Sequence, residues 1–256
     1  MPASVKLQEE FGDDVQVIFV HCQAPPQDEW EAFAWKMKWM GNGALWTEER
    51  PLNTIGEGLP ETAVIGIDGS VLLQGYPGDF GKKLHETVAA EIKKAKDAPD
   101  GTPKELAKPW QLFNKGDVAG ALAECDKLAS EDATALKSRF VKLTLAKVER
   151  AQRMLDSGYV AEAEKLLGAL DKVAKANPEI AEKLATQTAR LATPEMAQER
   201  DAGKAFANFV GKIAKEKPFE EGNVKKAASI AEKFKGTKTA ERAARFVALA
   251  KVKVAM

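Results

Sequence analysis

The spacing of apolar residues changes once along this chain, near residues 96–103. Up to residue 95, apolar residues occur both in strand-like runs and at helical spacing, but beyond residue 103 they follow helical spacing almost throughout. The junction, KDAPDGTP, contains two prolines, one glycine and no large apolar side chain, which is typical of a linker. The sequence therefore predicts an α/β domain over residues 1–95, a linker over 96–103 and an all-α domain over 104–256.

Charge divides the chain at the same place. Residues 1–95 carry 8 basic and 15 acidic side chains, a balance of −7, and residues 96–256 carry 30 and 23, a balance of +7. The formal net charge of zero argues against whole-chain affinity for nucleic acid or an anionic membrane. Lysines such as Lys225 and Lys233 are interspersed with glutamates and predict a solvated helical face. No run of 18 apolar residues predicts a membrane span.

The first 95 residues predict strands between helices. Residues 15–20 are β-branched and almost all apolar, which favours a strand buried on both faces. A helix is expected before this strand, ending at Gly12, and another after it, capped by Asp28. The second helix places apolar residues at three- and four-residue steps and should bury them: Trp30, Phe33, Met37 and Met40.

A β-hairpin and a closing helix are expected next. The apolar runs 62–67 and 70–74 flank Asp68-Gly69, a pair that tolerates the positive φ angles of a type I′ turn. Residues 82–95 then have helical spacing. The sequence thus predicts the order helix, strand, helix, hairpin, helix.

This order and one motif resemble a known family. Residues 58–69, GLPETAVIGIDG, resemble the GxPxTFxIDxxG segment of thioredoxin-like proteins, especially redoxins anchored outside bacterial membranes. Residues 15–37 resemble that family's preceding strand and helix, so the resemblance covers roughly residues 2–95. It implies a cis peptide bond at Pro60, one sheet shared by the stretches around Phe19, Ile65 and Leu72, and thiol–disulfide exchange outside the cytoplasm.

The family's catalytic motif is absent. Thioredoxin-like enzymes use a CxxC pair, whose first thiolate attacks disulfides and whose second thiol resolves the mixed disulfide. This sequence contains no CxxC, and residues 1–7 resemble the stretch just downstream of that motif and of the family's central strand. Two explanations stay open: a sequence that lacks its beginning, or a non-catalytic relative. The first residues show no secretion signal, and no cofactor is expected.

The two cysteines give weak site candidates. Cys22 follows His21 and could act as a single-cysteine nucleophile, but adjacent strand residues point to opposite faces, which favours a structural role. Cys125 has helical apolar spacing and predicts a core thiol. Because His85 is the only other histidine, neither a metal site nor a disulfide framework is expected.

Two pairs of residues are candidates for binding. The resemblance implies that Leu59, before the cis proline, offers its backbone to a substrate, although Pro60 could simply start a strand. Trp35 and Trp39, four residues apart, form either part of the core or an apolar patch for a protein or peptide partner.

The second half repeats a short motif. GxVxxA occurs at 116–121, 158–163 and 222–227, where we expect the glycine to reverse the chain between helices and the alanine to allow close packing. The motif resembles the turn of tetratricopeptide repeats, though without their 34-residue period, and an unrelated bundle is the alternative. The chain is thus read as a thioredoxin-like protein without disulfide reductase activity, or as a peptide- or protein-binding scaffold.

Overall fold

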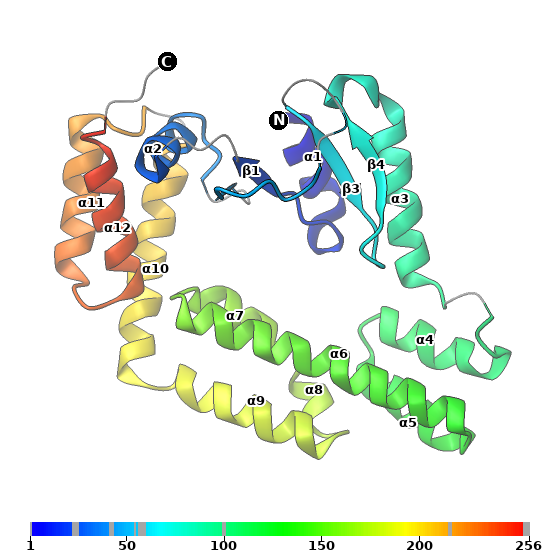
Figure 1. Ribbon diagram of the computed structural model, residues 1–256. Coiled ribbons are helices and arrows are strands. Elements are labelled where there is room, and N and C mark those ends of the chain that lie inside the picture. The colour runs from blue at the N-terminus through cyan, green and yellow to red at the C-terminus, as the bar shows by residue number, and fades with distance from the viewer. Residues whose placement is uncertain are drawn as a thin grey trace. The chain divides into compact units, whose positions relative to one another are not determined.

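The computed structural model describes residues 2–21, 26–40, 44–53, 55, 60–98, 101–214 and 217–252. Two compact units divide the chain, and the boundary lies between Thr102 and Pro103 (Figure 1). We call them unit 1 and unit 2. Within the described residues, no helix combines the length and the apolar character that a membrane crossing needs.

Unit 1 combines helices with four short strands. Its elements are α1 (Pro2–Phe11), η1 (Gly12–Asp14), β1 (Phe19–His21), α2 (Gln27–Lys36), β2 (Ala44–Trp46), β3 (Thr62–Ile65), β4 (Val71–Gly75), η2 (Pro77–Asp79) and α3 (Lys82–Lys96). The strands make two separate sheets: β1 is parallel to β2, and β3 is antiparallel to β4. The expectation of a single sheet through Phe19, Ile65 and Leu72 is therefore wrong for the described residues.

The strand expected over residues 15–20 is shorter than its composition suggests. Only Phe19–His21 pair with another strand, and all three are partly exposed. Ile18, directly before them, is 57% exposed. A strand buried on both faces needs a layer on each face. Because these residues lack such cover, an apolar run alone was not enough to extend the strand.

The predicted hairpin is present, but its turn is not type I′. Gly69 has φ +82° whereas Asp68 is not in the positive-φ region, and a type I′ turn needs both. The Gly69 amide donates to the Gly66 carbonyl, and the Gly66 amide donates to the Ser70 carbonyl. Asp68 accepts hydrogen bonds from the side chain and amide of Ser70, which lower its pKa. A turn stabilised by the Asp68 side chain therefore replaces the expected type I′ turn.

Unit 1 has a thin core around α3. This helix packs on β3 and β4, and Leu73, Phe80 and Val88 are buried there. Helix α1 is tied to α3 by Glu10, whose carboxylate lies 2.8 Å from His85 Nε2. On α2 only Trp30 of the expected apolar stripe is buried; Met37 lies beyond the end of the helix and is 48% exposed, which corrects that part of the prediction.

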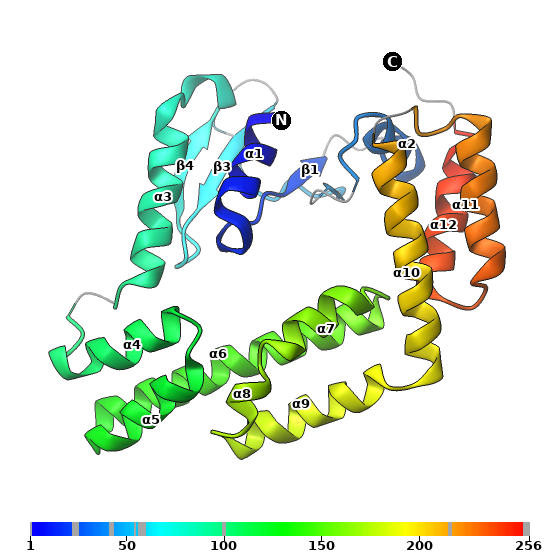
Figure 2. The same ribbon diagram turned by 180° about the vertical axis from the view of Figure 1, so that it is seen from behind.

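The regular elements in the described part of unit 2, residues 103–214 and 217–252, are all helices, as the sequence predicted (Figure 2). Its elements are η3 (Lys104–Leu106), α4 (Ala107–Asn114), α5 (Val118–Leu128), α6 (Glu131–Asp156), α7 (Val160–Gly168), α8 (Asp171–Ala174), α9 (Pro178–Leu191), α10 (Pro194–Ile213), α11 (Glu221–Lys233) and α12 (Lys238–Leu249). Five of these helices have an N-cap residue whose side chain accepts a hydrogen bond from an amide of the first turn: Asp117, Ser130, Asn177, Thr193 and Thr237. Such caps satisfy amides that the helix itself leaves unpaired.

The GxVxxA motif works as expected at two of its three sites. Gly116 and Gly158 have φ +84° and +76° in the turns before α5 and α7. Gly222 instead lies inside the first turn of α11, and Gly236, with φ +92°, lies in the turn before α12. The third glycine was assigned wrongly because α11 begins before the motif. The motif's alanines behave alike, since all three are fully buried: Ala121, Ala163 and Ala227.

A buried carboxylate joins α10 to the start of α12. Glu199, only 5% exposed, accepts hydrogen bonds from the amides of Lys238 (2.7 Å) and Thr239 (2.9 Å). Negative charge at a helix N-terminus is favourable because the unpaired amides there carry partial positive charge. Arg242 donates to the Gly158 carbonyl at 3.1 Å and lies 4.2 Å from the ring centre of Tyr159. These contacts tie the α6–α7 turn to α12.

Candidate functional site

Helices α6 and α9 enclose a groove along their shared face. One hollow of about 400 Å³ has six polar lining residues: Glu149, Gln152, Arg153, Lys183, Thr186 and Gln187. A second hollow, of about 350 Å³, is lined by α6 between Thr134 and Leu145 and by Glu179 of α9. Because both hollows lie against the same two helices, we describe them together as the α6–α9 groove.

The local sequence explains why α6 can line a groove and still pack. Its apolar stripe is buried at roughly one-turn steps: Leu136, Phe140, Thr144, Val148, Ala151 and Leu155. Thr144 satisfies its hydroxyl within the helix by donating to the Phe140 carbonyl at 2.8 Å. The side chains next to this stripe, such as Glu149 and Gln152, are exposed. They are free to line the groove because they take no part in the core.

Gln187 is the unusual residue of this groove. It continues the buried stripe of α9 after Ile180 and Leu184, and it is only 7% exposed. Its Oε1 accepts a hydrogen bond from Arg190 at 3.1 Å. Within the described part of the chain, no hydrogen bond uses its Nε2. This Nε2 keeps contact with solvent at the groove, so water can satisfy it in the free protein and the carbonyl oxygen of a ligand can replace that water.

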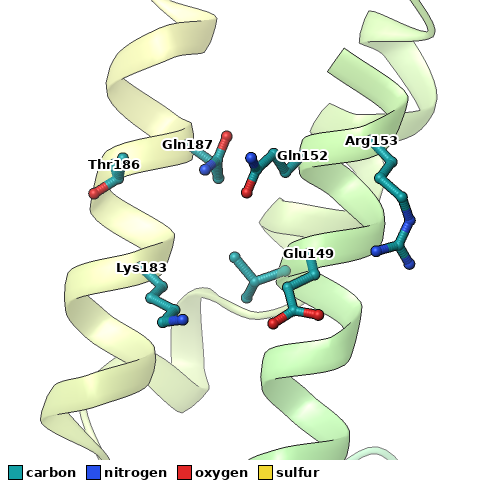
Figure 3. Close-up of a pocket in the computed structure, with 7 residues that line it drawn as sticks. Glu149, Gln152, Arg153, Lys183, Thr186 and Gln187 are labelled. Atoms are coloured by element: carbon teal, nitrogen blue, oxygen red, sulfur yellow. The ribbon is translucent and has the colours of Figure 1, made fainter. Parts of the chain in front are cut away.

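Side chains from both helices point into the groove. Figure 3 shows Gln187 of α9 and Gln152 of α6 pointing toward each other, and Lys183 and Glu149 pointing into the same space. No ion pair joins Lys183 or Glu149 to another described residue. Each amide can donate and accept, and each charge is available, so the lining suits a chain that alternates hydrogen-bond donors and acceptors.

The lining of the groove consists mainly of amide, hydroxyl and charged side chains. Neither histidine nor cysteine lines either hollow. Among the described residues, no three side chains of histidine, cysteine, aspartate or glutamate are close enough together to hold a metal ion. The hydrogen-bonding and charged side chains of the lining suit a polar ligand.

The site residues predicted from the sequence lie elsewhere. Cys22 and Leu59 fall outside the described residues. Pro60 is exposed, two residues before β3, so it stands at the place where a missing amide does no harm.

The two candidate tryptophans are both partly buried. Trp39 stacks on Phe19 with ring centres 6.2 Å apart and meets Phe33 edge-on at 5.3 Å. Aromatic pairs in this range stabilise a local cluster. Trp39 therefore belongs to an aromatic cluster of unit 1, while its use by a partner, with Trp35, stays a prediction.

The structure places the remaining titratable candidates in different environments. Cys125 is 3% exposed on α5, and burial raises the pKa of its thiol. This agrees with the predicted core thiol and opposes a reactive one, since the thiolate is the nucleophile. Burial also lowers the pKa of His21, whose ring centre lies 6.1 Å from that of Trp30. His85 bonds to Glu10 at the surface.

Sequence reasoning missed the α6–α9 groove, although one signal was available. Ile180, Leu184 and Gln187 follow helical spacing, so a glutamine occupies a position that an apolar residue would normally take. A polar side chain on a buried stripe needs a partner. Searching each helix for that exception would have identified Gln187, though not the helix that faces it.

Comparison with models of protein families, with curated proteins and with solved structures gives no match for this chain.

Proposed function

We propose that this protein is a non-catalytic binding scaffold that holds an extended peptide segment in the α6–α9 groove. The observation that carries this proposal is the Nε2 donor of Gln187, which is solvent-accessible at the groove although the rest of the side chain is almost fully buried. An extended peptide presents carbonyl oxygens at regular intervals, and one of them satisfies this donor. Gln152, on the facing helix, bonds the other edge of the same peptide backbone.

The charges of the groove add side-chain preference. Lys183 and Glu149 are both free to pair, so a bound segment gains from carrying one acidic and one basic side chain. Rigid helices hold these groups, and little ordering of the protein is needed on binding.

Binding of a peptide pool to the full chain tests this proposal. We would incubate the protein with a pool of random nine-residue peptides and quantify the captured peptides by mass spectrometry. Wild type should retain a subset of the pool. Gln187→Leu keeps the size and completes the apolar stripe, so it should fold and lose at least about tenfold of the captured material.

Gln111→Leu is the matched control, because Gln111 is an exposed glutamine on α4, outside the groove. Capture should stay at the wild-type level in this variant. Equal capture by wild type and Gln187→Leu, or no capture by wild type, would refute peptide binding in the groove.

A second candidate concerns unit 1. We infer that it is related to the thioredoxin-like redoxins, as the resemblance of residues 2–95 suggests. One observation supports this: the β3–β4 hairpin follows Pro60 and precedes α3, as the resemblance implies. The two separate sheets oppose it, because the resemblance implies one shared sheet.

The same relation predicts that these 256 residues do not reduce disulfides, because the sequence has one cysteine in each predicted domain and no CxxC. An insulin-reduction assay on the full chain should show no turnover. Turnover that Cys22→Ser abolishes and Cys125→Ser leaves intact would overturn this expectation and assign catalysis to Cys22.

A further inference from the structure

The two hollows of the α6–α9 groove lie on one face of α6. Their α6 lining residues follow one another at steps of three and four, which places them on the same side of the helix: Thr134, Ser138, Val141, Leu145, Glu149 and Gln152. At a rise of about 1.5 Å per residue, the face from Thr134 to Arg153 is about 28 Å long. An extended peptide of about nine residues covers that length at about 3.3 Å per residue. One such peptide therefore reaches both hollows.

The second hollow differs from the first because it contains an apolar pair. Val141 and Leu145, one helical turn apart on α6, line it and are partly buried. Lys137, beside them, already pairs with a carboxylate of α5, and the other two charged lining residues, Lys142 and Glu179, are exposed and opposite in sign. Partly buried apolar side chains gain free energy when further apolar surface covers them. The second hollow is therefore suited to an apolar side chain of a ligand.

We propose that the peptide held by Gln187 also places an aliphatic side chain, that of leucine, isoleucine or valine, on Val141 and Leu145. This inference rests on the peptide binding proposed above and adds the residue class that the groove selects. The centre of the Val141–Leu145 pair lies about 13 Å along α6 from Gln152, which points toward Gln187 (Figure 3). At about 3.3 Å per residue, the aliphatic residue stands about four positions from the residue that bonds Gln187.

Continuity between the hollows identifies the same peptide as the occupant of both. Along α9 the lining passes from Glu179 in the second hollow to Lys183 in the first, one helical turn further. Along α6 the step from Leu145 to Glu149 is also one turn, so the hollows adjoin on both helices. A peptide that leaves the first hollow along α6 therefore passes over Leu145 and Val141. Its side chain loses no further translational freedom on contact, whereas a separate ligand would.

Sequencing of the captured peptides tests this inference. Among random peptides that the full wild-type chain retains, one aligned position should be enriched at least about threefold in leucine, isoleucine and valine. Leu145→Gln makes this surface polar and keeps a good helix former, so its captured peptides should lose the enrichment. Val141→Thr, close in size, should do the same and serves if Leu145→Gln does not fold. Leu143→Gln is the matched control: Leu143 is a 42% exposed leucine of α6 outside both hollows, and its replacement should leave the enrichment unchanged.

One captured peptide supplies a second measurement. Replacing its aliphatic residue by alanine should weaken binding to wild type at least about fivefold but binding to Leu145→Gln less than about twofold, because the two side chains act as a pair. Equal weakening in both proteins, or equal loss of the enrichment in Leu143→Gln, would overturn the inference. No enrichment among peptides that wild type retains and Gln187→Leu loses would overturn it too, and would leave peptide binding in place. Failure of wild type to retain any peptide would overturn both proposals.

Discussion

Unit 2 buries its large apolar side chains within itself, whereas unit 1 leaves many of its own in solvent. Seven of the largest fully buried apolar residues belong to unit 2: Phe140, Phe246, Leu122, Leu155, Ile180, Leu249 and Val160. Nine of the eleven large hydrophobic residues that are exposed among the described ones belong to unit 1: Ile18, Met37, Leu45, Ile55, Ile65, Ile67, Val71, Leu72 and Tyr76.

The difference follows from how each kind of element closes its surface. A helix satisfies its own backbone and needs only a neighbour along one stripe, and the next helix in the chain supplies it. A strand needs partners on both edges and cover on its faces, and those come from distant parts of a sequence. With two strands in each sheet, unit 1 has few of these partners. The helices of unit 2 are therefore fully packed against neighbours in the chain, whereas the two small sheets of unit 1 are only partly covered.

Truncating one large core residue in each unit should show the difference most strongly. Phe140 is fully buried and stacks on Phe113, with ring centres 4.1 Å apart. Phe140→Ala should lower the free energy of unfolding of unit 2 by about 3–5 kcal/mol. Leu73→Ala, at a 9% exposed site of unit 1, should cost that unit no more than about 2 kcal/mol, at the low end for such changes.

Hydrogen exchange measured by mass spectrometry reads the two units separately, which one melting curve does not do. An equal or larger loss for Leu73→Ala would show that unit 1 is as tightly packed as unit 2, and the comparison would fail.

An added methyl group should sharpen the comparison at a turn of each unit. A Cβ at Gly158 would lie 2.7 Å from Glu199 Oε1 and 2.8 Å from Lys238 Cβ, and the φ of +76° is already unfavourable for alanine. Gly158→Ala should therefore destabilise unit 2 by about 3 kcal/mol or more, combining overpacking with backbone strain.

Gly69→Ala is its counterpart in unit 1. Gly69 has φ +82° and open space around it, so only the backbone cost of about 1–2 kcal/mol applies. Thermal unfolding of both variants checks the ordering. Similar losses of stability in the two variants would mean that the Glu199 side chain moves easily away from residue 158. Unit 2 would then be less rigid there than its packing implies.

The smallest effect concerns pH and the buried thiol of unit 2. Because burial raises the pKa of Cys125 in the folded protein, the unfolded chain loses this proton first as the pH rises. Its contribution to stability is thus complete below the unfolded thiol's pKa and is lost as the pH climbs through the folded one. Iodoacetamide at pH 8 should label Cys125 at least about 100-fold more slowly in the native protein than in urea. Equal rates would show that α5 opens readily.

The sequence predicted most of unit 2 because its signals are local. Asn177 and Thr237 cap helices, and apolar spacing marks the faces that are buried. The prediction that Gly222 reverses the chain was wrong, because Gly222 lies in the first turn of α11. The GxVxxA motif looks the same whether its glycine lies in the turn before a helix or in the first turn of the helix. Which glycine takes a positive φ depends on where the preceding loop ends, and spacing alone does not determine that.

Strand pairing and the groove could not be predicted in the same way. The apolar run before His21 looks the same whether or not another strand lies beside it, so periodicity predicted a longer strand and one common sheet. The donor of Gln187 becomes informative only when α6 lies across from it, because the facing helix sets which side chains share the space. Both depend on contacts between residues far apart in the chain.

The carboxylate of Glu199 also restricts how this protein can vary. Its Oε1 occupies the space beside Gly158, and its two oxygens hold the first amides of α12, so the residues at 158 and 199 are compatible only as a pair. In a library randomised at both positions, selection for folded protein would enrich larger residues at 158 only together with shorter ones at 199. That statistical dependence would locate the contact between the α6–α7 turn and α10 without any structure.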